Sequence, residues 1–165
     1  MAATTIRLLT EADLAVYRAL LMSGLEQDAD SFRIAPEDEQ HAPFPTQNRP
    51  DSFTMGAFVG EQLAGVVSFQ RDGAERVKLR HKGLLFRMYV SPNVRGQGLA
   101  GLLIQEVIDR ARQLDGLEQL VLTVTTTNPA KRIYERFGFR SFSLEENAMK
   151  WRGTYLTEEA MKLML

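Results

Sequence analysis

Cysteine is absent from the 165 residues of this chain, which excludes disulfide bonds, thiolate metal sites and a cysteine nucleophile. No apolar run approaches the roughly 20 residues that span a bilayer. The first residues also lack the basic and then apolar order of a signal peptide. The net charge of −1 shows no basic excess, which argues against a nucleic-acid-binding protein. The sequence therefore predicts a cytoplasmic protein without a metal centre that binds neither membranes nor nucleic acids.

The composition that remains is that of a folded protein, with 44% hydrophobic and 25% charged residues. We expect one mixed α/β domain over 1–165. Turn residues at 60–62 predict a hairpin of two strands, and a longer strand is expected at about 77–90 with a bulge near Gly83. Alternation along the longer strand predicts one face with Leu84, Phe86, Met88 and Val90 and another with Leu85, Arg87 and Tyr89.

The stretch from Met88 to Ala100 is the most informative part of the sequence. It indicates the end of a strand, a turn with two glycines, and the start of an amphipathic helix. The first amides of a helix have no partner within it, and the macrodipole adds partial positive charge there. Gly96 and Gly98 allow the backbone to approach a bulky anion closely. This stretch therefore predicts a binding site for a phosphate-bearing ligand.

A second motif follows the next expected strand, at 120–125. Strand, helix and strand of this length form a parallel crossover. Asn128 and Pro129 then predict another helix start, with Asn128 as the N-cap and Pro129 as the first helical residue. Gly138 is a natural C-terminal stop for that helix, and closing strands are expected at 139–144, around 149–151 and at 160–165.

The two motifs together resemble the GNAT superfamily of N-acetyltransferases over roughly residues 84–142. The matching patterns are Arg95-x-x-Gly98-x-Ala100 and Asn128-Pro-Ala-x-x-x-Tyr134-x-x-x-Gly138-Phe139. The resemblance implies a mixed, mainly antiparallel sheet with a central splayed parallel strand pair, flanked by helices on both faces. It further implies an acetyl-CoA core at about 77–142 and acceptor-side helices at about 10–50.

The resemblance also implies which residues bind acetyl-CoA, the co-substrate of the family. In GNAT enzymes the pantetheine arm enters the gap between the two splayed strands. The backbone of Met88 and Val90 would hydrogen-bond this arm. Asn128 would also bond the arm, and Lys131 would reach the phosphates. The other implied binding residues are those of the pyrophosphate loop and one tyrosine: Arg95, Gly96, Gln97, Gly98, Leu99, Ala100 and Tyr134.

Tyr134 occupies the position that the family uses for its general acid. Acyl transfer to an amine expels the CoA thiolate, and a phenol with a reference pKa of about 10 is a suitable proton donor. The alternative is a core aromatic residue, because Ala130 and Tyr134 lie one helical turn apart. Helix capping alone likewise explains Asn128. Local pairing or solvation on the surface explains Arg95 and Lys131.

The sequence does not supply an evident general base. Many relatives place a glutamate early in the strand before the loop, but residues 84–89 here contain no acid. His81 is the nearest titratable candidate and has a suitable reference pKa, although a lone histidine at a strand end is more often a surface or hydrogen-bonding residue. The acids Glu26, Asp28 and Asp30 either lie by the acceptor cleft or form a solvated face.

Three hypotheses follow for the function. The first is an N-acetyltransferase that joins acetyl-CoA and an amine acceptor in a ternary complex, since no cysteine is present to form an acyl-enzyme. The second is a catalytically silent sensor that binds CoA or acyl-CoA. The third, a nucleotide-binding protein of another type, is disfavoured because the loop lacks the Gly-x-x-x-x-Gly-Lys-Ser/Thr pattern of a P-loop. The acceptor stays undefined, and homodimers are common in the family, so a homodimer is among the expectations.

Overall fold

The computed structural model describes residues 2–165. Its strands are β1 (Thr4–Leu9), β2 (Ser52–Val59), β3 (Gln62–Arg71), β4 (Lys82–Val90), β5 (Gln119–Thr125), β6 (Arg140–Trp151) and β7 (Thr154–Met164). Its helices are α1 (Leu14–Gln27), α2 (Pro36–Glu39), α3 (Leu99–Arg112) and α4 (Lys131–Arg136), with short 3-10 turns η1 (Glu11–Asp13), η2 (Ala29–Ser31) and η3 (Pro92–Val94).

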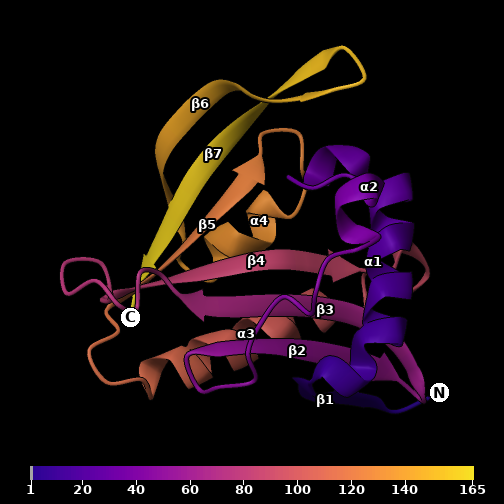
Figure 1. Cartoon of the computed structure of the whole chain (residues 1–165), viewed down its shortest axis with the longest axis horizontal. Coiled ribbons are helices and arrows are strands. Elements are labelled where there is room, and N and C mark those ends of the chain that lie inside the picture. The colour runs from indigo at the N-terminus through magenta and orange to yellow at the C-terminus, as the bar shows by residue number, and fades with distance from the viewer. Residues whose placement is uncertain (1) are drawn as a thin grey trace.

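The strands form one sheet in the order β1-β2-β3-β4-β5-β7-β6. Every neighbouring pair is antiparallel except β4 and β5, which are parallel. Helices α1 and α2 lie on one face of the sheet, here called the α1 face, and α3 and α4 lie on the other, here called the α3 face (Figure 1). This mixed and mainly antiparallel arrangement confirms the predicted fold class.

Helix α1 covers the α1 face and follows directly on η1, which begins with a side-chain cap. The Thr10 hydroxyl accepts a hydrogen bond from the chain two residues on, and the Thr10 amide donates to the Asp13 carboxylate at 2.9 Å, which forms a capping box. The buried side of α1 then packs Tyr17 and Leu21 against Tyr89 of β4. This cluster of side chains forms the smaller of two hydrophobic cores.

The larger core lies on the α3 face, and α3 supplies the predicted apolar stripe. Leu103 and Val107 are completely buried there against Leu120 of β5. Full burial of such side chains stabilises the fold by about 1.5–3 kcal/mol each. The core therefore fixes the start of α3 relative to the ends of β4 and β5.

The parallel pair β4–β5 separates before either strand ends. Pairing runs from Lys82 opposite Gln119 to Leu84 opposite Val121. Beyond these residues β4 continues to Val90 on its partner β3, and β5 continues on its partner β7. The two strands therefore enclose an opening, here called the gap, between 85–90 of β4 and 122–125 of β5. The predicted splayed pair is confirmed.

Strand β4 corrects three details of the sequence prediction. It begins at Lys82 rather than 77, because the chain from 73 to 82 forms consecutive turns. Gly83 pairs regularly; a side chain there would collide with the Phe69 ring, so close packing and not a bulge requires the glycine. The irregularity lies instead between Phe86 and Tyr89, where Arg87 takes a left-handed φ of 52°.

This displaced bulge reverses the faces predicted for half of the strand. Leu85 belongs to the core of the α3 face, and Met88 and Val90 pack against the same core. Phe86 and Arg87 line a depression on the α1 face instead. The alternation predicted from period two is therefore wrong across the bulge, because one extra residue shifts every later side chain to the opposite face.

The carboxyl-terminal third follows the prediction with adjusted boundaries. Helix α4 begins at Lys131, after a turn at the Asn128-Pro129 pair rather than at that pair. In place of the three expected closing strands there are two long ones, β6 and β7, joined by a tight turn in which Arg152 and Gly153 both have positive φ. Among the described residues, no helix is both long and apolar enough to cross a membrane.

Candidate functional site

The loop before α3 turns through two glycines that face open space. Gly96 and Gly98 have φ of 78° and 83°, values that favour glycine. A Cβ built on either residue would meet no heavy atom within 4 Å. The glycines are therefore required by backbone conformation and leave room for a ligand beside the loop, as the sequence predicts.

The same loop presents a row of amides without acceptors. In the described residues, the backbone N–H groups from Gly96 to Gly101 donate no hydrogen bond, and the first amide of α3 that is paired belongs to Leu102. Leu99 buries its side chain in the core while its amide stays at the helix start, and Gln97 and Ala100 complete the turn. This concentration of free donors and helix dipole suits a polyanion such as a pyrophosphate.

The spacing of Gly96, Gly98 and Gly101 also matches the Gly-x-Gly-x-x-Gly pattern of dinucleotide-binding loops. That pattern operates in a parallel, doubly wound sheet. Here β4 has a parallel neighbour over three residue pairs alone and is otherwise antiparallel to β3. The sheet around these glycines therefore differs from that of a dinucleotide-binding fold.

Strand β4 directs unused backbone groups into the gap. The Ser91 amide donates to the Ala64 carbonyl of β3 at 2.8 Å. Because the groups of successive residues alternate in direction along a strand, the N–H and C=O of Met88 and Val90 point away from β3. Of these groups, the Val90 carbonyl already accepts from Arg95 Nε at 3.0 Å. The others face the gap, where an extended ligand is able to pair with them as a strand does.

Arg95 turns back toward the sheet and makes local contacts. Its Nε donates to the Val90 carbonyl at 3.0 Å, and its Nη2 donates to the Asp28 carboxylate at 2.8 Å. The guanidinium also lies 5.6 Å from the centroid of the Tyr89 ring. Arg95 thus ties the pyrophosphate-type loop to the end of α1, and Asp28 is the one of the three candidate acids that this contact uses.

Tyr134 lies in the core of the α3 face with its ring edge-on to Phe139 at 5.8 Å. That core also receives the side chains of Met88 and Val90, the residues that line the gap. Burial raises the pKa of Tyr134 well above its ordinary value, and in residues 2–165 no hydrogen bond to the hydroxyl offsets it. The phenol therefore keeps its proton at neutral pH.

Asn128 and Lys131 have local partners. The Asn128 Oδ1 accepts a hydrogen bond from the Ala130 amide at 2.9 Å, which forms an Asx turn. The predicted N-cap is wrong, because Ala130 is the N-cap of α4 and no side chain caps it. The Lys131 ammonium lies 2.7 Å from Glu159 of β7, and this contact raises its pKa. The ion pair holds α4 against β7 at the side of the gap.

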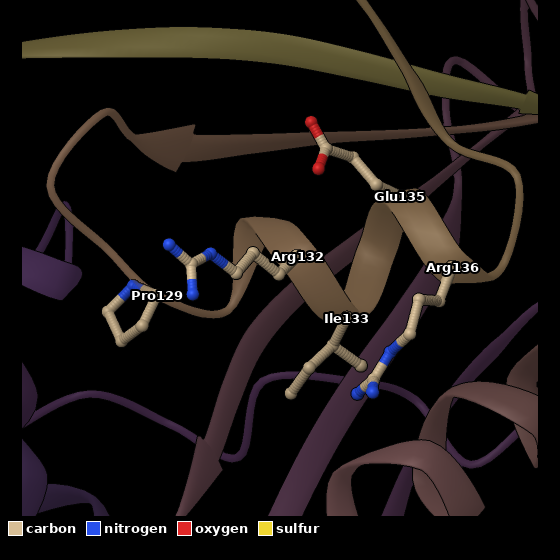
Figure 2. A pocket seen from close by; sticks show the side chains of 5 residues that line it. All are labelled: Pro129, Arg132, Ile133, Glu135 and Arg136. Carbon is tan, nitrogen blue, oxygen red and sulfur yellow. The ribbon is translucent and has the colours of Figure 1, made fainter.

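The outer side of α4 carries a shallow depression of about 620 Å³ (Figure 2). Arg132 and Arg136 lie one turn apart on its rim with Ile133 between them. The end of α4 is close to α3, because the Phe137 ring lies 3.8 Å from where a Gly101 side chain would begin. These two arginines place positive charge on the outer side of α4.

His81 lies at the opposite end of β4 from the gap. Its carbonyl accepts from the Glu118 amide at 2.8 Å, where β5 is about to begin. At about 3.3 Å per residue, the seven residues from His81 to Met88 span about 23 Å. The structure therefore does not bring His81 together with the other predicted site residues.

Two carboxylates that the sequence prediction did not single out are buried on the α1 face. Glu39 is fully buried and lies 2.9 Å from the Arg87 guanidinium, which also bonds the Tyr17 hydroxyl at 3.2 Å. Burial outweighs this ion pair and raises the pKa of Glu39. The second, Glu158 of β7, is 4% exposed and pairs with Arg33 at 3.0 Å. No local motif marks either residue, because each partner is distant in sequence.

The comparisons with known proteins agree on one family. A family model described as "Acetyltransferase (GNAT) family" matches residues 19–139. An uncharacterised N-acetyltransferase of Schizosaccharomyces pombe is 38% identical over 55 residues, which are 33% of this chain and 34% of that protein. The match thus spans about a third of the length of this curated relative.

Solved structures share the fold over nearly the whole chain. An acetyltransferase of the GNAT family from Streptococcus pneumoniae aligns with a TM-score of 0.82 and 24% identity, covering 99% of this chain and 100% of that one. A putative acetyltransferase from Salmonella typhimurium, solved with its cofactor acetyl-CoA, aligns with a TM-score of 0.80 and 20% identity over 99% and 95% of the two chains.

Proposed function

Because the chain belongs to the GNAT acetyltransferase family, we propose that it transfers the acetyl group of acetyl-CoA to an amine acceptor. The observation that carries this proposal is the row of free amides from Gly96 to Gly101, which lies directly after the splayed end of β4. The loop offers a pyrophosphate site, and the gap beside it offers an extended channel for a pantetheine arm.

The donor would bind mainly to backbone. The pyrophosphate would accept hydrogen bonds from the loop amides, as anions do at helix starts, with Arg132 and Arg136 on the outer side of α4 as further cations. The pantetheine arm would pair with the gap-facing groups of Met88 and Val90. Asn128 would present its side-chain amide nitrogen to the arm, because its Oδ1 is already engaged in the Asx turn. A solved relative that contains acetyl-CoA supports this choice of donor.

The two cations predicted from sequence would act at a distance from this arm. Arg95 would hold the loop in its binding shape through Asp28 and the Val90 carbonyl. Lys131 would keep α4 in place through Glu159 and add positive charge on the side of the phosphates. Both roles make the side chains supports of the loop and helix that face the donor.

The proposed reaction is direct attack in a ternary complex. The amine nitrogen forms a bond to the thioester carbonyl carbon, a backbone N–H of β4 stabilises the carbonyl oxygen, and the carbon–sulfur bond breaks. Tyr134 gives its phenolic proton to the departing sulfur and regains one from the nitrogen or from water. Burial raises the pKa of Tyr134 and so weakens it as an acid, and the proton that the attacking nitrogen releases offsets this cost by replacing the one that the sulfur takes.

A thiol-release assay tests the proposal. The protein is incubated with acetyl-CoA and a panel of free amino acids, peptides, polyamines and aromatic amines, and CoA thiol is followed with a chromogenic disulfide. At least one amine class should give saturable release that depends on both substrates. CoA binding without release across the panel would contradict the enzyme and favour a sensor.

A further inference from the structure

A short segment after η2 crosses the gap on the α1 face. The Phe32 ring lies 5.7 Å from the ring of Tyr89, on the splayed end of β4. The next side chain, Arg33, reaches Glu158 of β7 on the other side, and η2 packs against β5 between them. Consecutive residues thus connect both sides of the gap.

Glu158 of β7 lies beside the last residue of β5 and faces this crossing segment. It pairs directly with Thr125 in the antiparallel register of β5 and β7, so the two side chains share the α1 face. The Thr125 hydroxyl is buried and has no hydrogen-bond partner in the described chain. Glu158 is therefore a nearly buried carboxylate beside an unsatisfied hydroxyl at the mouth of the gap.

The ion pair between Arg33 and Glu158 leaves hydrogen-bonding groups free on both side chains. Arg33 donates through Nε alone, at 3.0 Å and 3.1 Å to the two Glu158 oxygens. Its two terminal nitrogens have no partner in residues 2–165, and the side chain is 59% exposed. The carboxylate also keeps lone pairs free, since a single N–H occupies one direction of approach.

A pocket of about 390 Å³ adjoins this ion pair, and its walls mix apolar side chains with the charged Asp38 and Lys150. Arg33 is part of its wall, and so is Leu156, which lies two residues from Glu158 on the same face of β7. The volume falls in the range of small-molecule sites. The other apolar side chains that line it are Leu25, Phe32, Ile34, Met149 and Trp151.

We propose that this site accepts a free α-amino acid with an apolar side chain. The ammonium of the acceptor binds Glu158, its carboxylate binds the terminal nitrogens of Arg33, and its side chain enters the pocket along the apolar part of the wall. The inference rests on the proposed acetyl transfer and names its acceptor class. The opposed charges of Arg33 and Glu158, beside a cavity with apolar side chains in its wall, match the three parts of such an amino acid.

The assignment gives Glu158 a chemical task. The α-ammonium transfers one proton to the Glu158 carboxylate, and the resulting neutral amine attacks the thioester carbon. The nitrogen loses its second proton as the carbon–sulfur bond breaks, and this proton replaces the one that the sulfur takes from Tyr134. The balance is one N-acetyl amino acid, one CoA thiol and one proton, which Glu158 returns to water.

The test compares acceptors that differ in the carboxylate alone. Leucine, leucinamide, isoamylamine and leucyl-glycyl-glycine are assayed with acetyl-CoA, and thiol release is measured at equal pH. Leucine should exceed leucinamide in kcat/KM by at least about 10-fold. Arg33→Gln should reduce this ratio to within about 2-fold of one and leave the KM for acetyl-CoA unchanged. Arg33→Lys should restore part of the ratio.

Glu158→Gln tests the proton acceptor through the pH profile. Without the carboxylate, kcat/KM should fall by about 100-fold near neutral pH and recover only as the amine loses its proton in solution. Arg49→Gln, which breaks an exposed ion pair with Asp51 remote from this site, is the matched control and should keep the wild-type ratio. Thermal melting verifies that each variant folds, and the wild-type ratio stands independently of any variant.

The outcomes separate this inference from the proposed function. Thiol release that is equal for leucine and leucinamide, or greater for the peptide, overturns the amino-acid assignment but leaves acetyl transfer intact. An unchanged pH profile in Glu158→Gln overturns the role of Glu158. CoA binding with no release for any amine overturns both proposals.

Discussion

The proposed donor side of the gap is built from backbone groups, whereas the proposed acceptor side is built from side chains that are far apart in sequence. On the donor side, six successive amides and two glycines with positive φ lie within residues 96–101. On the acceptor side, Arg33 and Glu158 are 125 residues apart in sequence. A backbone site tolerates changes of side chain and keeps its ligand, while a side-chain site changes its ligand with one substitution. The difference explains how one donor is combined with different acceptors.

Substitution of Tyr134 should give the largest change on the donor side. Tyr134→Phe removes a single oxygen, and we expect turnover to fall by about 10²–10⁴-fold, the usual contribution of a general acid. The KM for acetyl-CoA should stay within about 2-fold, because the ring still packs on Phe139. Steady-state kinetics measure both constants. Unchanged turnover would make Tyr134 a core aromatic residue and nothing more.

The buried ion pair of the α1 face should give the largest change in stability. Glu39→Ala leaves the half-buried Arg87 guanidinium without its carboxylate, and we expect the free energy of unfolding to drop by up to about 3 kcal/mol. Urea denaturation measures the change. Glu106→Ala, which breaks an exposed pair on α3, should cost about 0.5 kcal/mol or less. Similar losses for the two variants would show that burial adds nothing to the first pair.

Gly98 tests whether the donor loop acts through its backbone. Gly98→Val should weaken CoA binding by about 100-fold, equivalent to about 2.7 kcal/mol, because a β-branched side chain crowds the amides and resists φ of 83°. Gly116→Val is the control for strain, since Gly116 has φ of 71° and equally open surroundings at the other end of α3. Calorimetric titration with CoA should show normal affinity in that control. Equal affinities in both variants would place the anion elsewhere.

The smallest effect concerns pH and the buried phenols. Burial is the main cause that raises the pKa of Tyr17, Tyr89 and Tyr134 in the folded protein. Above pH 10 the unfolded chain has lost these protons while the folded chain keeps them, so stability falls as pH rises. Each phenol contributes a slope of about 1.4 kcal/mol per pH unit.

Tyr134→Phe should therefore make the loss of stability between pH 10 and 11 shallower by up to that slope. Tyr155→Phe removes an exposed phenol and should leave the wild-type slope unchanged. Urea denaturation at pH 9, 10 and 11 measures each slope. Identical slopes for the wild type and Tyr134→Phe would contradict the effect of burial on this residue.

The same comparison explains how far the sequence predicts the protein. The donor loop, the splayed strands and the helix of Tyr134 were predicted because short-range patterns specify them: glycines at fixed spacing, and an Asn-Pro pair that forms the next turn. The alternation of side chains along β4 gave a wrong prediction at the bulge. The position of Arg87 there depends on its buried partner Glu39 and not on its neighbours in sequence. Local sequence therefore describes the donor side better than the acceptor side.

No short-range sequence pattern marks the proposed acceptor side, because its residues meet through folding alone. Arg33 and Glu158 are ordinary charged residues until folding brings η2 against β5. The titratable candidate for a base nearest in sequence to the strand before the loop is His81, which the structure places about 23 Å along β4 from Met88. A carboxylate contributed by β7 has no fixed spacing from the donor motif, so no single-sequence pattern reveals it.

The central claim is that the amides from Gly96 to Gly101 hold the phosphates of CoA. Amide nitrogen–proton NMR spectra of the uniformly ¹⁵N-labelled protein, recorded during titration with CoA, test it most directly. We expect large, saturable shifts of the Gly96, Gly98 and Gly101 amide signals, while the shifts of the Gly60 and Gly116 signals stay unchanged. Saturable CoA binding that leaves the three loop signals unmoved would contradict it.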